Sequence, residues 1–300
     1  MVPFAIRKLS LITLFVIPQF TFAQPSTTPK ILRPLDTVAA ELESTQKIVY
    51  KSIGDRQLSL HIFNPTGHNS SDRRTAFVTI HGGGWSGQDA RKFYPFADHY
   101  ARMGMVGISV EYRLYSKQQG VTVFDCVKDA RSAVRYIRKH AAELGIDPNK
   151  LIVSGGSAGA HLAAGTALFD EVNESTDNLS ISPTPNALVL YYPVIDTSPT
   201  GYGSEKIGDQ WKALSPVDNV RKRLPPTLVL HGTADTVTPF SGAKRFEQKM
   251  LEAGNHCQLI AYEGGAHGYF MFDLDLFQQA MSQTEVFLSE LDFLPGNAKP

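Results

Sequence analysis

The chain of 300 residues has few cysteines, no excess of charge of one sign and no long apolar run. Its two cysteines are too few for a disulfide framework or for a cysteine-based structural zinc site. The 29 basic residues balance the 29 acidic ones, which argues against a nucleic-acid binder and against a charged disordered chain. With 42% hydrophobic residues, the composition is typical of a globular protein with a sizeable core.

The first residues have the pattern of a secretory signal peptide. Arg7 and Lys8 precede the apolar run 9–17, and Thr21 and Ala23 supply the small side chains of a cleavage site. The apolar run has roughly half of the ~20 residues that a membrane-spanning helix needs. We therefore expect residues 1–23 to be removed and the protein to be secreted or periplasmic, without stable membrane insertion. A retained membrane anchor is the alternative.

The remainder predicts an N-terminal leader at 24–45 and one catalytic domain at 46–300, because no internal repeat and no Gly/Ser-rich linker divides it. Export would place Cys126 and Cys257 where a disulfide can persist. Nothing in the sequence brings the two cysteines together, so we favour two buried free thiols.

Strand and helix patterns alternate along the catalytic domain. Short apolar runs, rich in β-branched and aromatic residues, predict strands at 76–80, 106–110, 151–153, 187–190, 227–230 and 258–262. Apolar residues at helical spacing predict helices at 124–144, 240–253 and 277–291. A hairpin is expected from 46–53 and 57–63. This order predicts an α/β fold with a mostly parallel central sheet and helices on both faces.

A serine lies between small residues at one predicted strand-to-helix turn. Residues 155–159 read Gly-Gly-Ser-Ala-Gly and directly follow the strand at 151–153. A sharp turn at this point lifts the Ser157 hydroxyl above the sheet, and the start of the next helix offers backbone N–H groups to an anion. Ser157 is therefore a candidate nucleophile. A glycine-rich turn without chemistry is the alternative.

A second glycine-rich loop, His-Gly-Gly-Gly-Trp at 81–85, ends the strand at 76–80. Three glycines let the backbone aim N–H groups at a developing oxyanion, and we expect Gly83, Gly84 and Ala158 to supply them. A simple turn or a phosphate cradle is the alternative. The phosphate interpretation is weak, because no Lys-Ser/Thr pair follows and the glycine spacing does not fit a dinucleotide site.

A serine nucleophile needs a base to take its proton and an acid to orient that base. Asp235 follows the strand at 227–230, and His267 follows the strand at 258–262. Both should lie at the carboxyl edge of the sheet with Ser157, where sites of α/β folds form. The chain order Ser, Asp, His is the order expected for a serine hydrolase of this fold.

Several other residues compete for these roles. Asp196 follows the strand at 187–190 and is the alternative acid, although Asp235 is favoured. We interpret His81, His161 and His231 as structural. No cluster has metal-ligand spacing, so neither a metal nor a cofactor is expected. The long polar segment 196–226 is either a lid or substrate wall, or plain surface.

These segments together resemble the α/β-hydrolase superfamily over residues 46–291, specifically esterases with a His-Gly-Gly-Gly-Trp loop. The chain is similar to secreted acetyl-xylan and feruloyl-type carbohydrate esterases and to hormone-sensitive-lipase-like esterases. The resemblance implies that Ser157, Asp235 and His267 are nucleophile, acid and base. It also implies a structural role for the Tyr-Arg-Leu segment at 112–114. The N-terminal segment is too short for the helical cap of the lipase-like branch, so we expect no large cap domain and an open site.

We therefore predict a serine esterase that hydrolyses short-chain acyl esters, chiefly acetyl, on polysaccharides, oligosaccharides or small molecules through an acyl-enzyme. A feruloyl or general carboxylesterase is the nearest alternative, with aromatic residues available at Trp85, Tyr202, Trp211 and Tyr269. Of these, Trp85 and Tyr269 are the predicted substrate contacts. A formamidase-like amide hydrolase is disfavoured by the signal peptide, and a catalytically silent binding protein by the complete set of three residues.

Overall fold

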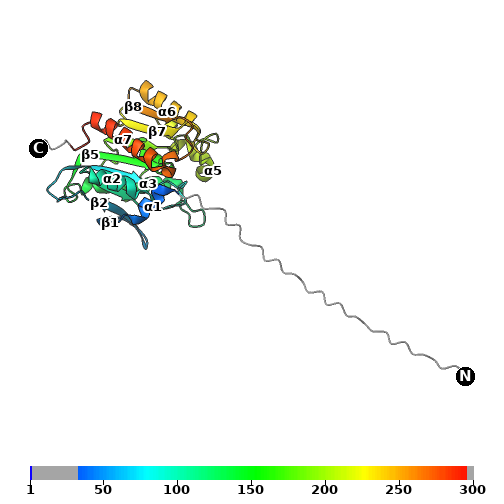
Figure 1. The fold of residues 1–300 in the computed structure, drawn as a ribbon, viewed down its shortest axis with the longest axis horizontal. Coiled ribbons are helices and arrows are strands. Elements are labelled where there is room, and N and C mark those ends of the chain that lie inside the picture. Colours follow the sequence, from blue (N-terminus) through cyan, green and yellow to red (C-terminus); the bar gives the residue numbers. More distant parts are fainter. Residues whose placement is uncertain (2–32, 296–300) are drawn as a thin grey trace. The chain divides into compact units, whose positions relative to one another are not determined.

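One eight-stranded sheet runs through the part of the chain that the computed structural model describes, which is residues 33–295 together with Met1 (Figure 1). The strand order is β1-β2-β4-β3-β5-β6-β7-β8. β2 is antiparallel to both of its neighbours, and all further pairs are parallel. The mostly parallel sheet confirms the predicted fold class. The predicted signal peptide and the first part of the predicted leader lie outside the described residues.

The strands match the runs predicted from the sequence. Their bounds are β1 (Gln46–Ile53), β2 (Arg56–Phe63), β3 (Arg74–Ile80), β4 (Val106–Val110), β5 (Ile146–Gly156), β6 (Ala187–Tyr191), β7 (Thr227–Gly232) and β8 (Cys257–Tyr262). β5 is longer than its apolar centre, because Arg74 at the start of β3 already pairs with Ile146. The predicted hairpin is formed by β1 and β2.

The helices include the predicted ones and three that were missed, α1, α2 and the short α5. Their bounds are α1 (Pro34–Glu41), α2 (Tyr94–Arg102), α3 (Val123–Lys139), α4 (Ala158–Leu168), α5 (Ser204–Ile207), α6 (Phe240–Glu252) and α7 (Leu274–Glu290). Short 3-10 turns are η1 (Ala90–Phe93), η2 (Gly208–Leu214), η3 (Pro216–Asp218) and η4 (Tyr269–Phe272). α7 begins earlier than predicted, because the Asp273 side chain accepts the N–H groups of Asp275 and Leu276.

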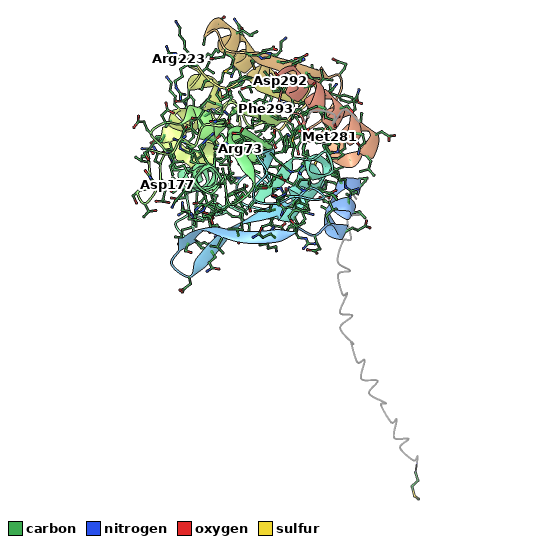
Figure 2. The ribbon with its side chains drawn as sticks, turned by 90° about the vertical axis from the view of Figure 1, so that its left-hand side faces the viewer. Arg73, Asp177, Arg223, Met281, Asp292 and Phe293 are labelled. Carbon is green, nitrogen blue, oxygen red and sulfur yellow. The ribbon has the colours of Figure 1, made fainter. Side chains whose placement is uncertain are left out.

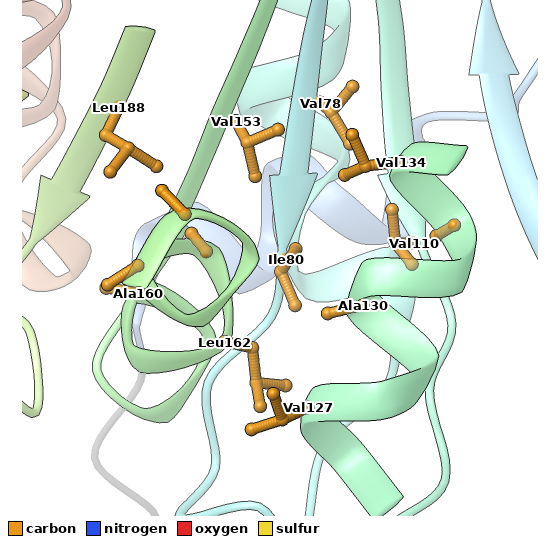
Figure 3. Close-up of a cluster of buried hydrophobic side chains, with 14 of the residues drawn as sticks. Val78, Ile80, Val110, Val127, Ala130, Val134, Val153, Ala160, Leu162 and Leu188 are labelled. Carbon is orange, nitrogen blue, oxygen red and sulfur yellow. The ribbon is translucent and has the colours of Figure 1, made fainter. Parts of the chain in front are cut away.

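Helices cover both faces of the sheet. α3, α4 and α6 pack on one face, whereas α1, α2 and α7 pack on the other. Figure 3 shows Leu162 of α4 beside Val127 of α3, with Ile80 of β3 above them. In Figure 2, Asp177, which contacts α3, and Met281, in α7, lie on opposite sides of the ribbon. The two apolar layers hold the sheet between the helices. The loops at the carboxyl edge of the sheet remain outside these layers.

Both cysteines are buried and free, as predicted. Burial raises the pKa of the Cys257 thiol to about 12, so this side chain stays a neutral apolar group. Among the described residues, no helix is long and apolar enough to cross a membrane.

Candidate active site

Ser157 occupies a strained turn between β5 and α4. Its φ is +55°, a conformation that non-glycine residues rarely adopt, and its N–H donates to the carbonyl of Tyr191 at 2.9 Å. The turn needs glycine at 159, because a Cβ there would lie 2.1 Å from the carbonyl oxygen of Ile80. The sequence Gly-Gly-Ser-Ala-Gly therefore lets α4 approach β3 closely and leaves the serine at the carboxyl edge of the sheet.

The structure brings the three predicted residues Ser157, His267 and Asp235 together in one hydrogen-bonded chain. The Ser157 Oγ lies 2.9 Å from His267 Nε2. On the other side of the ring, His267 Nδ1 lies 2.8 Å from Asp235 Oδ2. This geometry leaves Nε2 to accept the serine proton while Nδ1–H donates to the carboxylate. The loops after β5, β7 and β8 thus meet as the topology predicted.

The Asp235 carboxylate is held ionised by its neighbours. Burial by itself raises the pKa of this carboxyl, but hydrogen bonds from His231 and His267, the charge of His267 and the Thr238 N–H outweigh it, so the pKa lies well below its ordinary value. Oδ1 accepts the N–H groups of Val237 and Thr238, each at 2.8 Å. The fixed negative charge is suited to stabilise a protonated His267.

His231 braces this loop, as the sequence analysis expected. Its Nε2 lies 2.8 Å from the Thr238 carbonyl oxygen and 3.3 Å from Asp235 Oδ2. The ring is almost completely buried. It therefore contacts the same oxygen of Asp235 as His267 does, and it is not among the residues that line the pocket.

The glycine loop at 81–85 turns one N–H toward the serine. The carbonyl of Gly83 accepts the N–H groups of Ser86 at 3.1 Å and Gly87 at 3.0 Å. In a trans peptide the C=O and the following N–H point in opposite directions, so the N–H of Gly84 points away from these partners. Within residues 33–295 this N–H has no acceptor, and Gly84 lines the same pocket as Ser157.

The other two predicted oxyanion donors are the N–H groups of Gly83 and Ala158. The carbonyl of Gly82 accepts the Tyr112 hydroxyl at 3.2 Å, which turns the N–H of Gly83 the other way. The carbonyl of Ser157 accepts the N–H of His161 at 3.1 Å, and the N–H of Ala158, at the start of α4, has no acceptor within residues 33–295. Tyr112 thus has the structural role expected for the Tyr-Arg-Leu segment.

A pocket of about 280 Å³ opens above these groups. Its lining comes from the loops at the sheet edge, from the segment before α1 and from the segments around η1, α5 and η4. The residues are Arg33, Gly82, Gly83, Gly84, Gln88, Phe93, Ser157, Tyr192, Tyr202, Val237, His267, Gly268, Met271 and Phe272. The pocket is large enough for a small acyl group and part of an alcohol.

The two predicted substrate contacts do not line this pocket. Trp85 is fully buried, and its Nε1–H donates to His161 Nδ1 at 3.3 Å. Its backbone has a φ of +62°. Tyr269 stacks on Tyr262, with ring centres 4.3 Å apart, and is not among the residues that line the pocket. We predicted both contacts because Trp85 ends the glycine loop and Tyr269 follows His267 closely in the sequence. Closeness in sequence does not bring either side chain into the pocket.

The alternative acid, Asp196, lies elsewhere. Its carboxylate pairs with Arg245 and contacts neither His267 nor Ser157. The segment after it, 196–226, forms part of the pocket wall through Tyr202. Lys206 from α5 fastens this wall to the glycine loop, because its Nζ donates to the Gly84 carbonyl at 3.0 Å.

Four residues that line the pocket were not predicted from the sequence: Arg33, Phe93, Tyr192 and Met271. Phe93 and Met271 lie in 3-10 turns that no strand or helix pattern predicts. Tyr192 directly follows β6. Its φ is +37°, and its ring contacts that of His267, with ring centres 5.1 Å apart. Across residues 33–295, no three His, Cys, Asp or Glu side chains are placed to hold a metal ion.

The strained serine turn and the three hydrogen-bonded side chains, at the edge of a mostly parallel sheet, are those of an α/β hydrolase. Comparison with known proteins agrees, because residues 60–250 match the BD-FAE family. This match covers more than half of the chain. The chain belongs to the BD-FAE family.

Solved structures and curated relatives are similar to the chain. Esterase 2 of Thermogutta terrifontis is 39% identical, with a TM-score of 0.80 over 84% of this chain and 96% of that one. Esterase LipQ of Mycobacterium tuberculosis is 27% identical over 74% of this chain and 56% of its own length. An acetylxylan esterase of Xylanibacter ruminicola is 26% identical over 76% of this chain and 47% of its own length. The chain thus spans about half the length of these curated relatives.

Proposed function

We propose that the protein is an exported serine esterase that hydrolyses short-chain acyl esters, chiefly acetyl, on polysaccharides or oligosaccharides. The observation that carries the proposal is the continuous chain of hydrogen bonds from Ser157 through His267 to Asp235, beside three backbone N–H groups for which residues 33–295 supply no acceptor. The similarity to an acetylxylan esterase supports the acetyl and polysaccharide parts.

The proposed mechanism has two acyl-transfer steps. His267 takes the proton of Ser157 as Oγ attacks the ester carbonyl carbon, and the N–H groups of Gly83, Gly84 and Ala158 hold the oxyanion. The C–O bond to the alcohol breaks, and the alcohol leaves with the proton from His267. Water then attacks the acyl-enzyme in the same way, which releases the acid and restores the serine. Asp235 stabilises the charged imidazole in both steps.

The pocket supports short acyl groups. A cavity of about 280 Å³ must hold the acyl group and the first part of the alcohol, and the large side chains of Phe93, Tyr192 and Tyr202 limit its depth. Esterase 2 of Thermogutta terrifontis has been solved with propionate and with butyrate bound. A feruloyl esterase is the second candidate, because these same aromatic side chains could contact a phenolic ring.

The serine assignment is tested by Ser157→Ala with 4-nitrophenyl acetate as substrate. Because the three side chains act as a unit, we expect kcat to fall by about 10⁶, as in other triads. Retained turnover by the purified variant would show that another nucleophile operates. A series from acetate to octanoate should have its maximum at the short end, and a maximum at octanoate would contradict the short-chain proposal.

The substrate is tested by incubating the protein with acetylated and with feruloylated polysaccharides and measuring which acid is released. We expect acetate, whereas release of ferulate alone would favour the second candidate. Export is tested on the protein expressed in a secreting host. Cleavage after Ala23 predicts Gln24 as the first residue of the mature chain, and an intact Met1 would contradict it.

A further inference from the structure

Arg33 is the one permanently charged side chain among the described residues that line the pocket. It lies just before α1 and lines the pocket together with Ser157 and His267. No carboxylate side chain is among the described lining residues. Hydrolysis of a neutral ester does not need a cation at this place, so the charge indicates a property of the substrate.

The Arg33 guanidinium is only partly engaged within the protein. Its Nε and Nη2 both lie 2.8 Å from Asp36 Oδ2. Lys92 shares that carboxylate, with Nζ 3.3 Å from Oδ1. Two cations therefore face one carboxylate, and a net positive charge remains. Within residues 33–295, the Nη1 of Arg33 has no acceptor, and the side chain is 27% exposed.

Tyr192 adds a second donor between Arg33 and the nucleophile turn. A Cβ built on Gly156, the residue before Ser157, would lie 2.5 Å from the Tyr192 hydroxyl, so this hydroxyl adjoins the serine. Burial raises the pKa of Tyr192 above its ordinary range although the nearby charge of Arg33 lowers it, so the hydroxyl stays protonated. It has no acceptor among the described residues.

We propose that Arg33 is a specificity-determining residue that binds a carboxylate carried by the substrate close to its ester, with the Tyr192 hydroxyl as second donor. A guanidinium presents N–H groups in a planar fork that fits a carboxylate. The inference rests on the proposed esterase function and narrows its substrates to acidic esters. These are half-esters of dicarboxylic acids, where the acyl part carries the charge, or acyl esters of hydroxy acids and acidic sugars, where the alcohol part does.

Matched ester pairs test the proposal. For the acyl side, kcat/KM is measured by pH-stat for monoethyl succinate and for ethyl butyrate. For the alcohol side, the pair is 4-acetoxybenzoate and 4-acetoxybenzamide. Arg33→Gln removes the charge but keeps a donor for Asp36. We expect the ratio of charged to neutral substrate to fall about tenfold in one of the two pairs, which identifies the side, since a charged hydrogen bond in a partly exposed site has this magnitude.

Two further variants separate charge recognition from a structural role. Arg33→Lys keeps the charge without the fork and should retain part of the preference, whereas loss of both rates in equal proportion would indicate structure only. Arg102→Ala removes one positive charge from α2, from a side chain that is 74% exposed and outside the pocket. Its ratios should equal those of the unmodified enzyme. Ratios within twofold of wild type for Arg33→Gln in both pairs would overturn the proposal.

A binding measurement keeps the result independent of turnover. In the Ser157→Ala background, calorimetry should show that monoethyl succinate or 4-acetoxybenzoate binds about tenfold more weakly after Arg33→Gln, while the neutral partner of the pair does not change. If the wild-type protein hydrolyses no ester but shows this binding, the esterase proposal fails and the carboxylate site stands. Equal binding with and without Arg33 would overturn the site.

Discussion

The floor and the rim of the pocket are built differently. The floor consists of the strand-end loops that carry Ser157, Gly83–Gly84, Asp235 and His267, and it is fixed by main-chain contacts and hydrogen bonds. The rim consists of side chains from separate short segments: Arg33, Phe93, Tyr202, Met271 and Phe272. The comparison teaches that the loops at the sheet edge position the catalytic groups, whereas we expect the side chains of the rim to select the substrate.

The largest expected effect is on the floor. Asp235→Asn should lower kcat by about 10⁴, because an amide no longer fixes the tautomer of His267 or stabilises its charged form. The measurement is steady-state hydrolysis of 4-nitrophenyl acetate. Asp196→Asn is the matched control, since this carboxylate pairs with Arg245 outside the site. A larger loss in the control would show that the acid has been misassigned.

The next largest effect is a loss of stability when close main-chain contacts in the floor are disturbed. Gly159→Ala would place a Cβ 2.1 Å from the Ile80 carbonyl oxygen and 2.5 Å from that of His81. We expect the free energy of unfolding in urea to fall by about 3 kcal/mol. Gly54→Ala, at a positive φ of +55° with no neighbour within 4 Å, should cost only about 1 kcal/mol. Equal losses would contradict a floor fixed by close main-chain packing.

A buried histidine links the floor to the wall, and its charge state predicts a pH effect. His161 accepts from the indole of Trp85, and its Nε2 lies 2.7 Å from the Leu214 carbonyl oxygen. Burial lowers its pKa to about 4, although the bond to Leu214 opposes this. The unfolded chain therefore binds a proton more readily, and the stability is present above about pH 6.5 and lost as the pH falls toward 4.

From pH 7.5 to pH 5, this residue should cost the protein about 2 kcal/mol of unfolding free energy. Urea unfolding at both values measures the loss. In His161→Gln the pH dependence should be smaller by that amount, even though the variant is less stable at pH 7.5. His256→Gln, a change at an exposed position, should keep the wild-type dependence. An unchanged dependence in His161→Gln would contradict the assignment.

The smallest expected effect is on the rim, and it concerns only the preference among substrates of different acyl length. Tyr202→Ala enlarges the pocket, so kcat/KM for butyrate relative to acetate should rise about fourfold for each added CH₂ that gains contact, which follows from about 0.8 kcal/mol per buried CH₂. Tyr269→Ala is the control, because Tyr269 stacks on Tyr262 instead of lining the pocket. A change of the same size in both variants would contradict the claim that Tyr202 limits the pocket and Tyr269 does not.

This difference also explains what the sequence could predict. Ser157, Asp235 and His267 lie in short motifs directly after apolar strands. Because sites of α/β folds form at the carboxyl ends of parallel strands, the sequence was enough to predict that these residues meet. Arg33 and Tyr202 come from segments without such a pattern, and only tertiary packing places them at the pocket. Trp85 was misplaced because its ring is buried against His161 of α4, a tertiary contact that the sequence does not reveal. α1 was missed because its eight residues have only two buried side chains.

The central claim is that Ser157 becomes covalently acylated while His267 and Asp235 activate it. It is tested most directly by treating the protein with paraoxon, which phosphorylates esterase 2 of Thermogutta terrifontis, and locating the adduct by peptide mass spectrometry. We expect one diethylphosphoryl group per chain, on Ser157, with esterase activity lost in proportion and no adduct in Ser157→Ala. An adduct on another serine that accompanies the loss of activity, or full activity after complete labelling of Ser157, would contradict it.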